Sequence, residues 1–218
     1  MKVLMLVDDF WHPGEVIQRG LRSFVREGLE LDYVSAPKDI LTREFVGRYD
    51  VLAVCRTDCV TPANQNPWFD SRVTEFGPEE FAEYVRAGGG LVAIHSGLTI
   101  GKEDRPVPVY TDMTGSYFVT HPPRELTRVH ITRQCMITEG VKDFAVRDEH
   151  YQLKFTGEVE PFMETESEHG GRTVSGYTRP FGSGRVAALA PGHNLEVWEH
   201  PEFRKLFVGA LRYACGHD

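Results

Sequence analysis

The segment that decides the fold is Gly88-Gly89-Gly90-Leu91-Val92-Ala93-Ile94-His95-Ser96-Gly97. Three glycines precede a short apolar run that is typical of a strand buried on both faces. A polar side chain followed by small residues then resembles the strand–turn–helix elbow that presents the nucleophile of many hydrolases. An imidazole, His95, occupies the nucleophile's place. The segment therefore predicts the turn of a catalytic α/β scaffold without the usual nucleophile.

Length and composition favour one α/β domain over residues 1–218. Hydrophobic residues make up 41% of the chain and charged residues 26%, which is typical of a folded globular protein. The net charge is −8 and the chain has no long run of Lys or Arg. Nucleic acid and anionic membranes are therefore poor candidates as partners.

The first residues predict where the protein resides. The apolar run Met1–Val7 is short and ends at Asp8 and Asp9, unlike the core of a signal peptide. No stretch approaches the ~20 apolar residues of a transmembrane helix. We therefore expect a cytoplasmic protein with reduced cysteines at positions 55, 59, 135 and 215. The spacing of Cys55 and Cys59 does not match a redox or zinc pair.

The two halves of the chain carry different patterns. Continuous apolar runs alternate with helical spacing in the first half, which predicts a doubly wound, mostly parallel sheet. We place its strands at 2–7, 29–34, 51–55 and 91–94, and its helices at 15–27 and 77–87. The second half is rich in loops from about 98 to 180, with shorter, partly antiparallel strands. We place these at 128–132, 162–165, 172–178 and 186–190, before a last helix at 201–214 that we expect to pack on the sheet.

Polar side chains follow the predicted parallel strands. Asp8, Asp9, Trp11 and His12 come after the first strand, and His95 and Ser96 follow the strand of the opening segment. Because the carboxyl ends of parallel strands face one crevice, we expect these residues to meet there. Arg56-Thr57-Asp58 and Pro191-Gly192-His193-Asn194 end two further strands and join the same edge.

Two further segments are candidates for the site. His121 precedes Pro122 and Pro123, which stiffen a loop that could position it for binding, although it could instead only cap a turn. Asp148 and Glu149 could supply a carboxylate base, or could belong to a solvated turn.

A metal site is an alternative use of the same residues. Histidines and carboxylates from separate loops can hold a divalent ion such as zinc, with His95, His121, His193 and Asp148 as candidates. None of them has a short diagnostic spacing, so the sequence requires no cofactor.

Four segments together resemble the ThuA-like (trehalose utilisation) family, within the class I glutamine amidotransferase-like superfamily: 88–97, 115–122, 148–151 and 184–203. The resemblance implies a flavodoxin-like, three-layer α/β sandwich. It also implies a role in carbohydrate metabolism, on trehalose or a related disaccharide or keto-sugar. It does not imply glutaminase activity, because His95 replaces the elbow cysteine and Asn194-Leu195 follow His193 where amidotransferases have Pro-Glu.

The favoured hypothesis is an enzyme acting on a small carbohydrate by histidine acid–base chemistry. His95 and His193 would be the acid and base, with Asp148 and Glu149 as catalytic carboxylates. The expected substrate-binding residues are Asp8, Asp9, Trp11, His12, Ser96, Tyr117 and His121, and Trp68 could stack on the sugar beside Trp11 and Tyr117. The alternatives are a non-catalytic sugar-binding or regulatory module and a metal-dependent hydrolase. We also expect a homo-oligomer.

Overall fold

The computed structural model describes residues 1–24, 28–37, 40–58 and 75–216. In these residues nine strands form one sheet in the order β2-β1-β3-β4-β11-β10-β9-β6-β7, and β5 and β8 form a separate pair. The strands are β1 (Lys2–Leu6), β2 (Glu30–Val34), β3 (Val51–Val54), β4 (Gly90–Ile94), β5 (Ser116–Thr120), β6 (Glu125–Ile131), β7 (Phe144–Asp148), β8 (Gln152–Phe155), β9 (Glu160–Ser167), β10 (Gly171–Phe181) and β11 (Gly184–Leu189). The helices are α1 (Gly14–Leu21), α2 (Arg43–Val46), α3 (Pro78–Arg86), α4 (Pro108–Thr114), α5 (Leu195–Glu199) and α6 (Pro201–Cys215), with 3₁₀ turns η2 (His95–Leu98) and η3 (Met136–Thr138).

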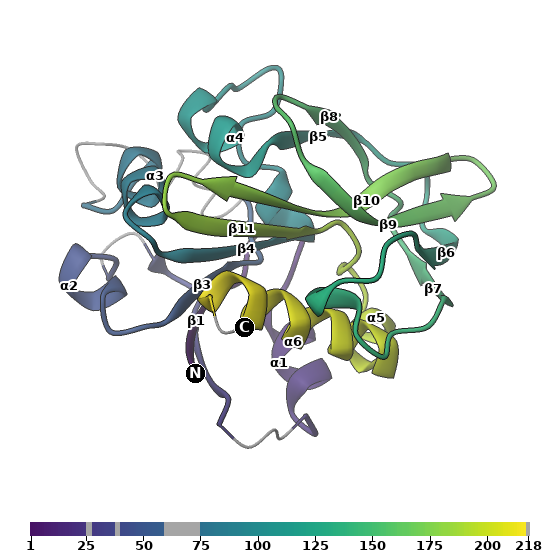
Figure 1. Ribbon diagram of the computed structural model, residues 1–218. Helices are drawn as coiled ribbons and strands as arrows, with labels where there is room; N and C mark the ends of the chain where they lie inside the picture. Colours follow the sequence, from purple (N-terminus) through teal and green to yellow (C-terminus); the bar gives the residue numbers. More distant parts are fainter. Residues whose placement is uncertain (25–27, 38–39, 59–74, 217–218) are drawn as a thin grey trace.

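The first part of the sheet is parallel, as the sequence predicts. Strands β2, β1, β3, β4 and β11 all run the same way, in a flavodoxin-like order. Helices α1, α5 and α6 share one apolar core with one face of these strands, and α2, α3 and α4 share a second core with the other face. Figure 1 shows the resulting three layers. The predicted flavodoxin-like α/β sandwich is therefore confirmed.

The second part of the sheet is antiparallel throughout. Each neighbouring pair from β11 to β7 is antiparallel, so β11 is the strand at which the sheet changes character. All four strands predicted in this half are present, although the structure shifts or extends their bounds. The sequence analysis missed β5, β7 and β8, which are short and have mixed burial.

The first helix is shorter than predicted. We expected residues 15–27, but α1 ends at Leu21. The helical spacing persists to Phe24 because that side chain still packs against the core, where its backbone N–H donates to the Leu21 carbonyl in a turn.

The last helix packs on the sheet as expected. The apolar side chains of α6 are buried in the core shared with β4 and β11, so they do not form a free surface for association. Among the described residues, no helix is both long and apolar enough to cross a membrane.

Candidate functional site: a cluster of histidines around Glu149

His95 occupies the predicted elbow. It follows β4 directly and adopts a left-handed backbone conformation, with φ of 46°. Two residues later the chain runs against β3, so that a methyl group on Gly97 would collide with the carbonyl oxygen of Val54. The glycine permits this close approach, and the sharp turn fixes the direction of the imidazole.

The protonation of His95 follows from its surroundings. Its side chain is 2% exposed, and Nδ1 lies 2.8 Å from the Ala190 carbonyl, which can only accept, so Nδ1 carries the proton. Burial lowers the pKa of His95 to about 4, which keeps the ring neutral at pH 7. The ring of Tyr151 stacks on it with centroids 3.9 Å apart. Nε2 therefore presents a lone pair to the site.

His12 is fixed by the buried carboxylate of Asp9. Its Nδ1 lies 2.7 Å from Asp9 Oδ1, while the other Asp9 oxygen accepts the backbone N–H of Thr57 at 2.8 Å. Burial alone would raise the pKa of Asp9, but its hydrogen bonds with His12 and with the backbone N–H groups of Thr57 and Trp11 outweigh burial and lower that pKa. Asp9 thus stays ionised, so His12 donates from Nδ1 and turns Nε2 toward the site, 3.3 Å from the Tyr151 hydroxyl.

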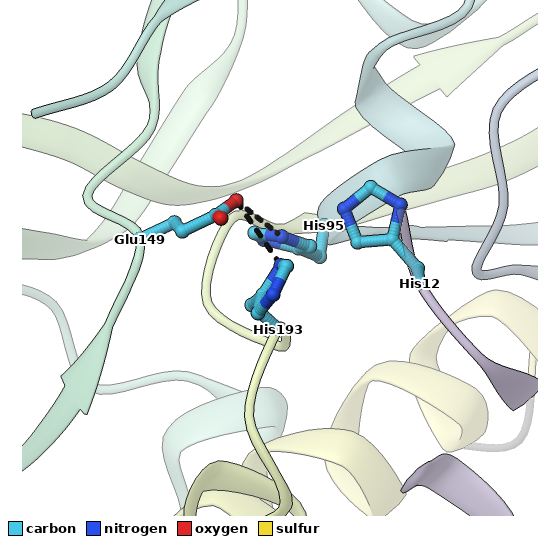
Figure 2. Close-up of side chains that lie close together, drawn as sticks. All are labelled: His12, His95, Glu149 and His193. Atoms are coloured by element: carbon cyan, nitrogen blue, oxygen red, sulfur yellow. Dashed lines mark ion pairs between the residues drawn. The ribbon is translucent and has the colours of Figure 1, made fainter. Parts of the chain in front are cut away.

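Glu149 lies at the centre of the histidines. Its Oε2 is 3.1 Å from Nδ1 of His193, 3.5 Å from Nε2 of His95 and 3.6 Å from Nε2 of His121. Burial would raise its pKa, but the adjacent His193 outweighs burial and lowers that pKa well below the usual range, so Glu149 is a carboxylate. Figure 2 shows Glu149 reaching toward His95 and His193, with His12 on the far side of His95.

Asp148 has a different place from its neighbour. It is the last residue of β7 and is 1% exposed. Its oxygens accept the backbone N–H groups of Gly192 and His193, at 2.8 and 3.1 Å. Burial raises its pKa to about 7 against these hydrogen bonds. The geometry makes Asp148 a residue that positions His193, since it holds the turn on which that imidazole sits.

Four of these residues form a potential metal-ligand set. The donor atoms of His12, His95, Glu149 and His193 all lie within 4.8 Å of one another. Nε2 of His95 and Nδ1 of His193 are buried and make no hydrogen bond with the described residues, although both face the Glu149 carboxylate. Imidazole nitrogens with one carboxylate suit zinc and other first-row divalent ions. The set differs from the sequence-based one, because His12 and Glu149 replace His121 and Asp148.

A cavity of about 420 Å³ opens beside this cluster. Five of the predicted site residues line it, namely Trp11, His12, His121, Glu149 and His193. His95 and Ser96 instead line a much smaller space of about 10 Å³ behind His12 and His193. The cavity is therefore open to a ligand while one of the imidazoles stays shielded.

Other predicted site residues lie off the cavity wall. Asp8 accepts the backbone N–H of Gly14 at 2.9 Å, which satisfies the start of α1. Tyr117 does not line the cavity, whereas its neighbour Phe118 does. Asp9 and Asp148 do not line the cavity either, but they hold His12 and the turn of His193 in place. Trp68 and Cys59 lie outside the described residues.

The sequence analysis missed several cavity residues. Tyr151 follows Glu149 by two positions and stacks on His95, and its position in Asp148-Glu149-His150-Tyr151 was the available signal. Thr57 belongs to the predicted strand end Arg56-Thr57-Asp58. The remaining missed residues come from loops and strands without a motif: Thr99, Lys102, Arg105, Phe118 and Arg124.

Comparison with known proteins agrees with this architecture. A putative ThuA-like protein from Parabacteroides merdae matches 99% of this chain and 90% of its own at 15% identity, with a TM-score of 0.74. One from Bacteroides uniformis matches 100% and 92% at 18% identity, with a TM-score of 0.70. A protein of Salmonella typhimurium described as cytoplasmic matches 98% and 99% at 15% identity, with a TM-score of 0.66. At these identities the likeness shows the fold alone.

The sequence itself identifies the family. No curated protein matches the chain. The family model described as trehalose utilisation, however, matches residues 8–214, which include every side chain of the histidine cluster. The chain therefore belongs to the ThuA family.

Proposed function

We propose that the protein is a metal-dependent enzyme that acts on a small carbohydrate in trehalose utilisation. The ion would be held by His12, His95, His193 and Glu149. The observation that carries this proposal is the convergence of their four donor atoms, with two buried imidazole nitrogens left without hydrogen bonds. Unpartnered buried polar atoms are costly, and a bound cation would satisfy both of them.

The surrounding hydrogen bonds support the ligand role. Nδ1 of His95 donates to the Ala190 carbonyl and Nδ1 of His12 donates to Asp9, so each ring has its other nitrogen available. Carboxylate or carbonyl partners of this kind orient metal-binding histidines and raise their basicity. A ring held neutral at pH 7, as His95 is, suits a ligand better than a proton donor.

The chemistry of such a centre is compatible with hydrolysis or elimination on a keto-sugar. A bound divalent ion would act as a Lewis acid on a sugar oxygen or on water. Proton transfer would then fall to His121, which lines the cavity, is about one-third exposed and lies 3.6 Å from Glu149. Trp11 lines the same cavity and is 65% exposed, so its ring can stack on the sugar.

Glutamine hydrolysis does not fit the site. That reaction needs a thiolate at the elbow, where this chain has His95. Cys55 ends the neighbouring strand but is 2% exposed, and burial raises the pKa of its thiol far above the usual range. A buried, protonated thiol is a poor nucleophile.

The test is metal content and turnover measured on the same untagged protein. We expect about one equivalent of a transition metal per chain, and turnover of a disaccharide or its keto derivative that a chelator abolishes. His95→Asn should lose both while the circular dichroism is kept, because Asn tolerates a left-handed backbone. His130→Asn, on β6 and outside both the cavity lining and the potential ligand groups, is the matched control. A metal-free wild type, or a fully loaded His95→Asn variant, would refute the metal centre. Sugar binding without turnover would favour a binding module.

A further inference from the structure

The cavity beside the histidines carries more basic than acidic side chains. Lys102, Arg105 and Arg124 line it, whereas Glu149 is its one acidic lining residue among the described residues. The chain as a whole has a net charge of −8, so this local excess runs against the overall composition. Arg105 pairs with Asp58. Lys102 and Arg124 are therefore the two basic side chains of the cavity whose role needs an explanation.

Lys102 lies on an aromatic wall that leads to the histidines. Its Nζ is 5.2 Å from the centre of the Phe118 ring. That ring is 4.4 Å from Tyr151, which in turn stacks on His95. No carboxylate of the described residues lies within ion-pair distance of Lys102. The contact with Phe118 holds the ammonium group at the cavity without neutralising it.

Arg124 reaches the site from the opposite half of the molecule. It precedes β6, and its Nη1 donates to Asn194 Oδ1 at 3.3 Å, next to His193 in the chain. In the described part of the chain no acidic group forms an ion pair with it. A guanidinium group has five N–H donors in a planar fork, so most remain available for a carboxylate or a phosphate.

From this arrangement we infer that the sugar bound in the cavity carries an anionic group, a carboxylate or a phosphate, which Lys102 and Arg124 bind together. The inference rests on the proposed function, since it assumes a sugar at this site. The Glu149 carboxylate faces His193 and His95 and therefore does not pair with Lys102 or Arg124. A neutral disaccharide would leave both cations without an ion-pair partner among the described residues. An anionic sugar would be neutralised by them and drawn into the cavity.

The test is calorimetric titration of the full chain, with and without added zinc, using glucose, glucuronate and glucose 6-phosphate as probes. We expect one of the anionic sugars to bind at least tenfold more tightly than glucose, with an advantage that shrinks as salt is raised. Glucuronate and glucose 6-phosphate distinguish a carboxylate from a phosphate. The double variant Lys102→Gln/Arg124→Gln should lose the advantage, so that the anionic sugars bind it no more tightly than glucose does. Lys142→Gln/Arg212→Gln changes the charge equally at exposed positions away from the cavity and is the control.

Equal affinities of the wild type for glucose and both anionic sugars, including no measurable binding of any, would overturn the inference. So would an equal loss in the control double variant. Metal content measured on the same samples separates the two proposals. A protein that binds no metal but keeps an anion preference dependent on Lys102 and Arg124 would refute the metal centre alone. A metal-loaded protein without that preference would refute the anionic substrate alone.

Discussion

The parallel and antiparallel halves of the sheet contribute different parts of the site. The parallel half supplies three imidazoles from the ends of its strands, with His12 after β1, His95 after β4 and His193 after β11. The antiparallel half supplies the carboxylate of Glu149, directly after β7. Parallel strands bring their carboxyl ends together by topology. Glu149 instead joins the site because the end of β7 lies against the turn after β11, where Asp148 accepts backbone hydrogen bonds.

The site residues are held in place by different means in the two halves. In the parallel half the backbone itself fixes the direction of the His95 imidazole, through the left-handed turn at His95 and the approach of Gly97 to β3. In the antiparallel half a side chain holds the two halves together, since Asp148 binds the backbone of the turn that carries His193. Disturbing the backbone of the elbow should therefore destabilise the fold, whereas removing the Glu149 carboxylate should weaken the site. The contact that Asp148 makes between the two halves should matter for stability.

The largest effect is expected from closing the space at the elbow. Gly97→Ala places a methyl group against the backbone of Val54, which cannot move without shifting β3. We expect a loss of about 3 kcal/mol or more in the free energy of unfolding, as for severe overpacking. Gly176→Ala, in the irregular part of β10, meets the side chains of Phe162 and Met163 and should cost less. Denaturant unfolding of both variants measures the two losses in the free energy of unfolding. Equal losses would mean that the two halves do not differ in this respect.

The next effect tests the carboxylate from the antiparallel half. Glu149→Gln keeps the size of the side chain but removes its charge from the centre of the histidines. We expect metal affinity to fall by more than the roughly 10- to 100-fold that follows loss of an outer-shell partner. Glu139→Gln, on an exposed position, is the control. Unchanged metal affinity in competition with a chromogenic chelator would mean that the histidines alone form the site.

Asp9 and Asp148 allow a direct comparison of the two halves. Asp9→Asn weakens the hydrogen bond that sets the tautomer of His12, so metal affinity should fall about 10- to 100-fold. Asp148→Asn places an amide N–H against a backbone N–H, so unfolding should become easier by about 1–3 kcal/mol. Because Asp9→Asn also places an amide N–H against a backbone N–H, both variants should unfold more easily. Metal titration should separate them, with the larger loss of affinity for Asp9→Asn, and equal losses of affinity would contradict separate roles.

The smallest effect is expected at a surface pair of the antiparallel half. Arg133 donates to Glu160 at 3.1 Å, and neither residue lines the cavity. Since exposed ion pairs contribute little, Glu160→Gln should move Tm by less than about 2 °C and leave metal content unchanged. A clear loss of metal would show that β9 couples to the site more tightly than its contacts suggest.

The sequence predicts the parallel half well because four of its strands, β1, β3, β4 and β11, are buried on both faces. Val51–Val54 is apolar at every position, so it can be predicted as a strand without knowledge of its neighbours. The strand Ser116–Thr120 is half exposed and pairs only with β8, so its pattern depends on contacts that no local window contains.

The dependence on non-local contacts also explains why some residues of the candidate site could not be predicted from the sequence. Histidines at strand ends could be gathered from topology alone. The choice between Asp148 and Glu149, or between Tyr117 and Phe118, depends on which of two neighbours faces the cavity. Successive residues of an extended chain point to opposite sides, so an uncertainty of one position reverses the assignment. Lys102 and Arg124 carry no motif and required the three-dimensional cavity.

We propose that the two halves of the sheet meet around one metal ion. The most direct test is anomalous X-ray diffraction from a crystal of untagged protein grown with the metal found by elemental analysis. We expect a single strong anomalous peak bounded by Nε2 of His12, Nε2 of His95, Nδ1 of His193 and Glu149. A metal-loaded crystal with no peak between these four side chains would contradict it.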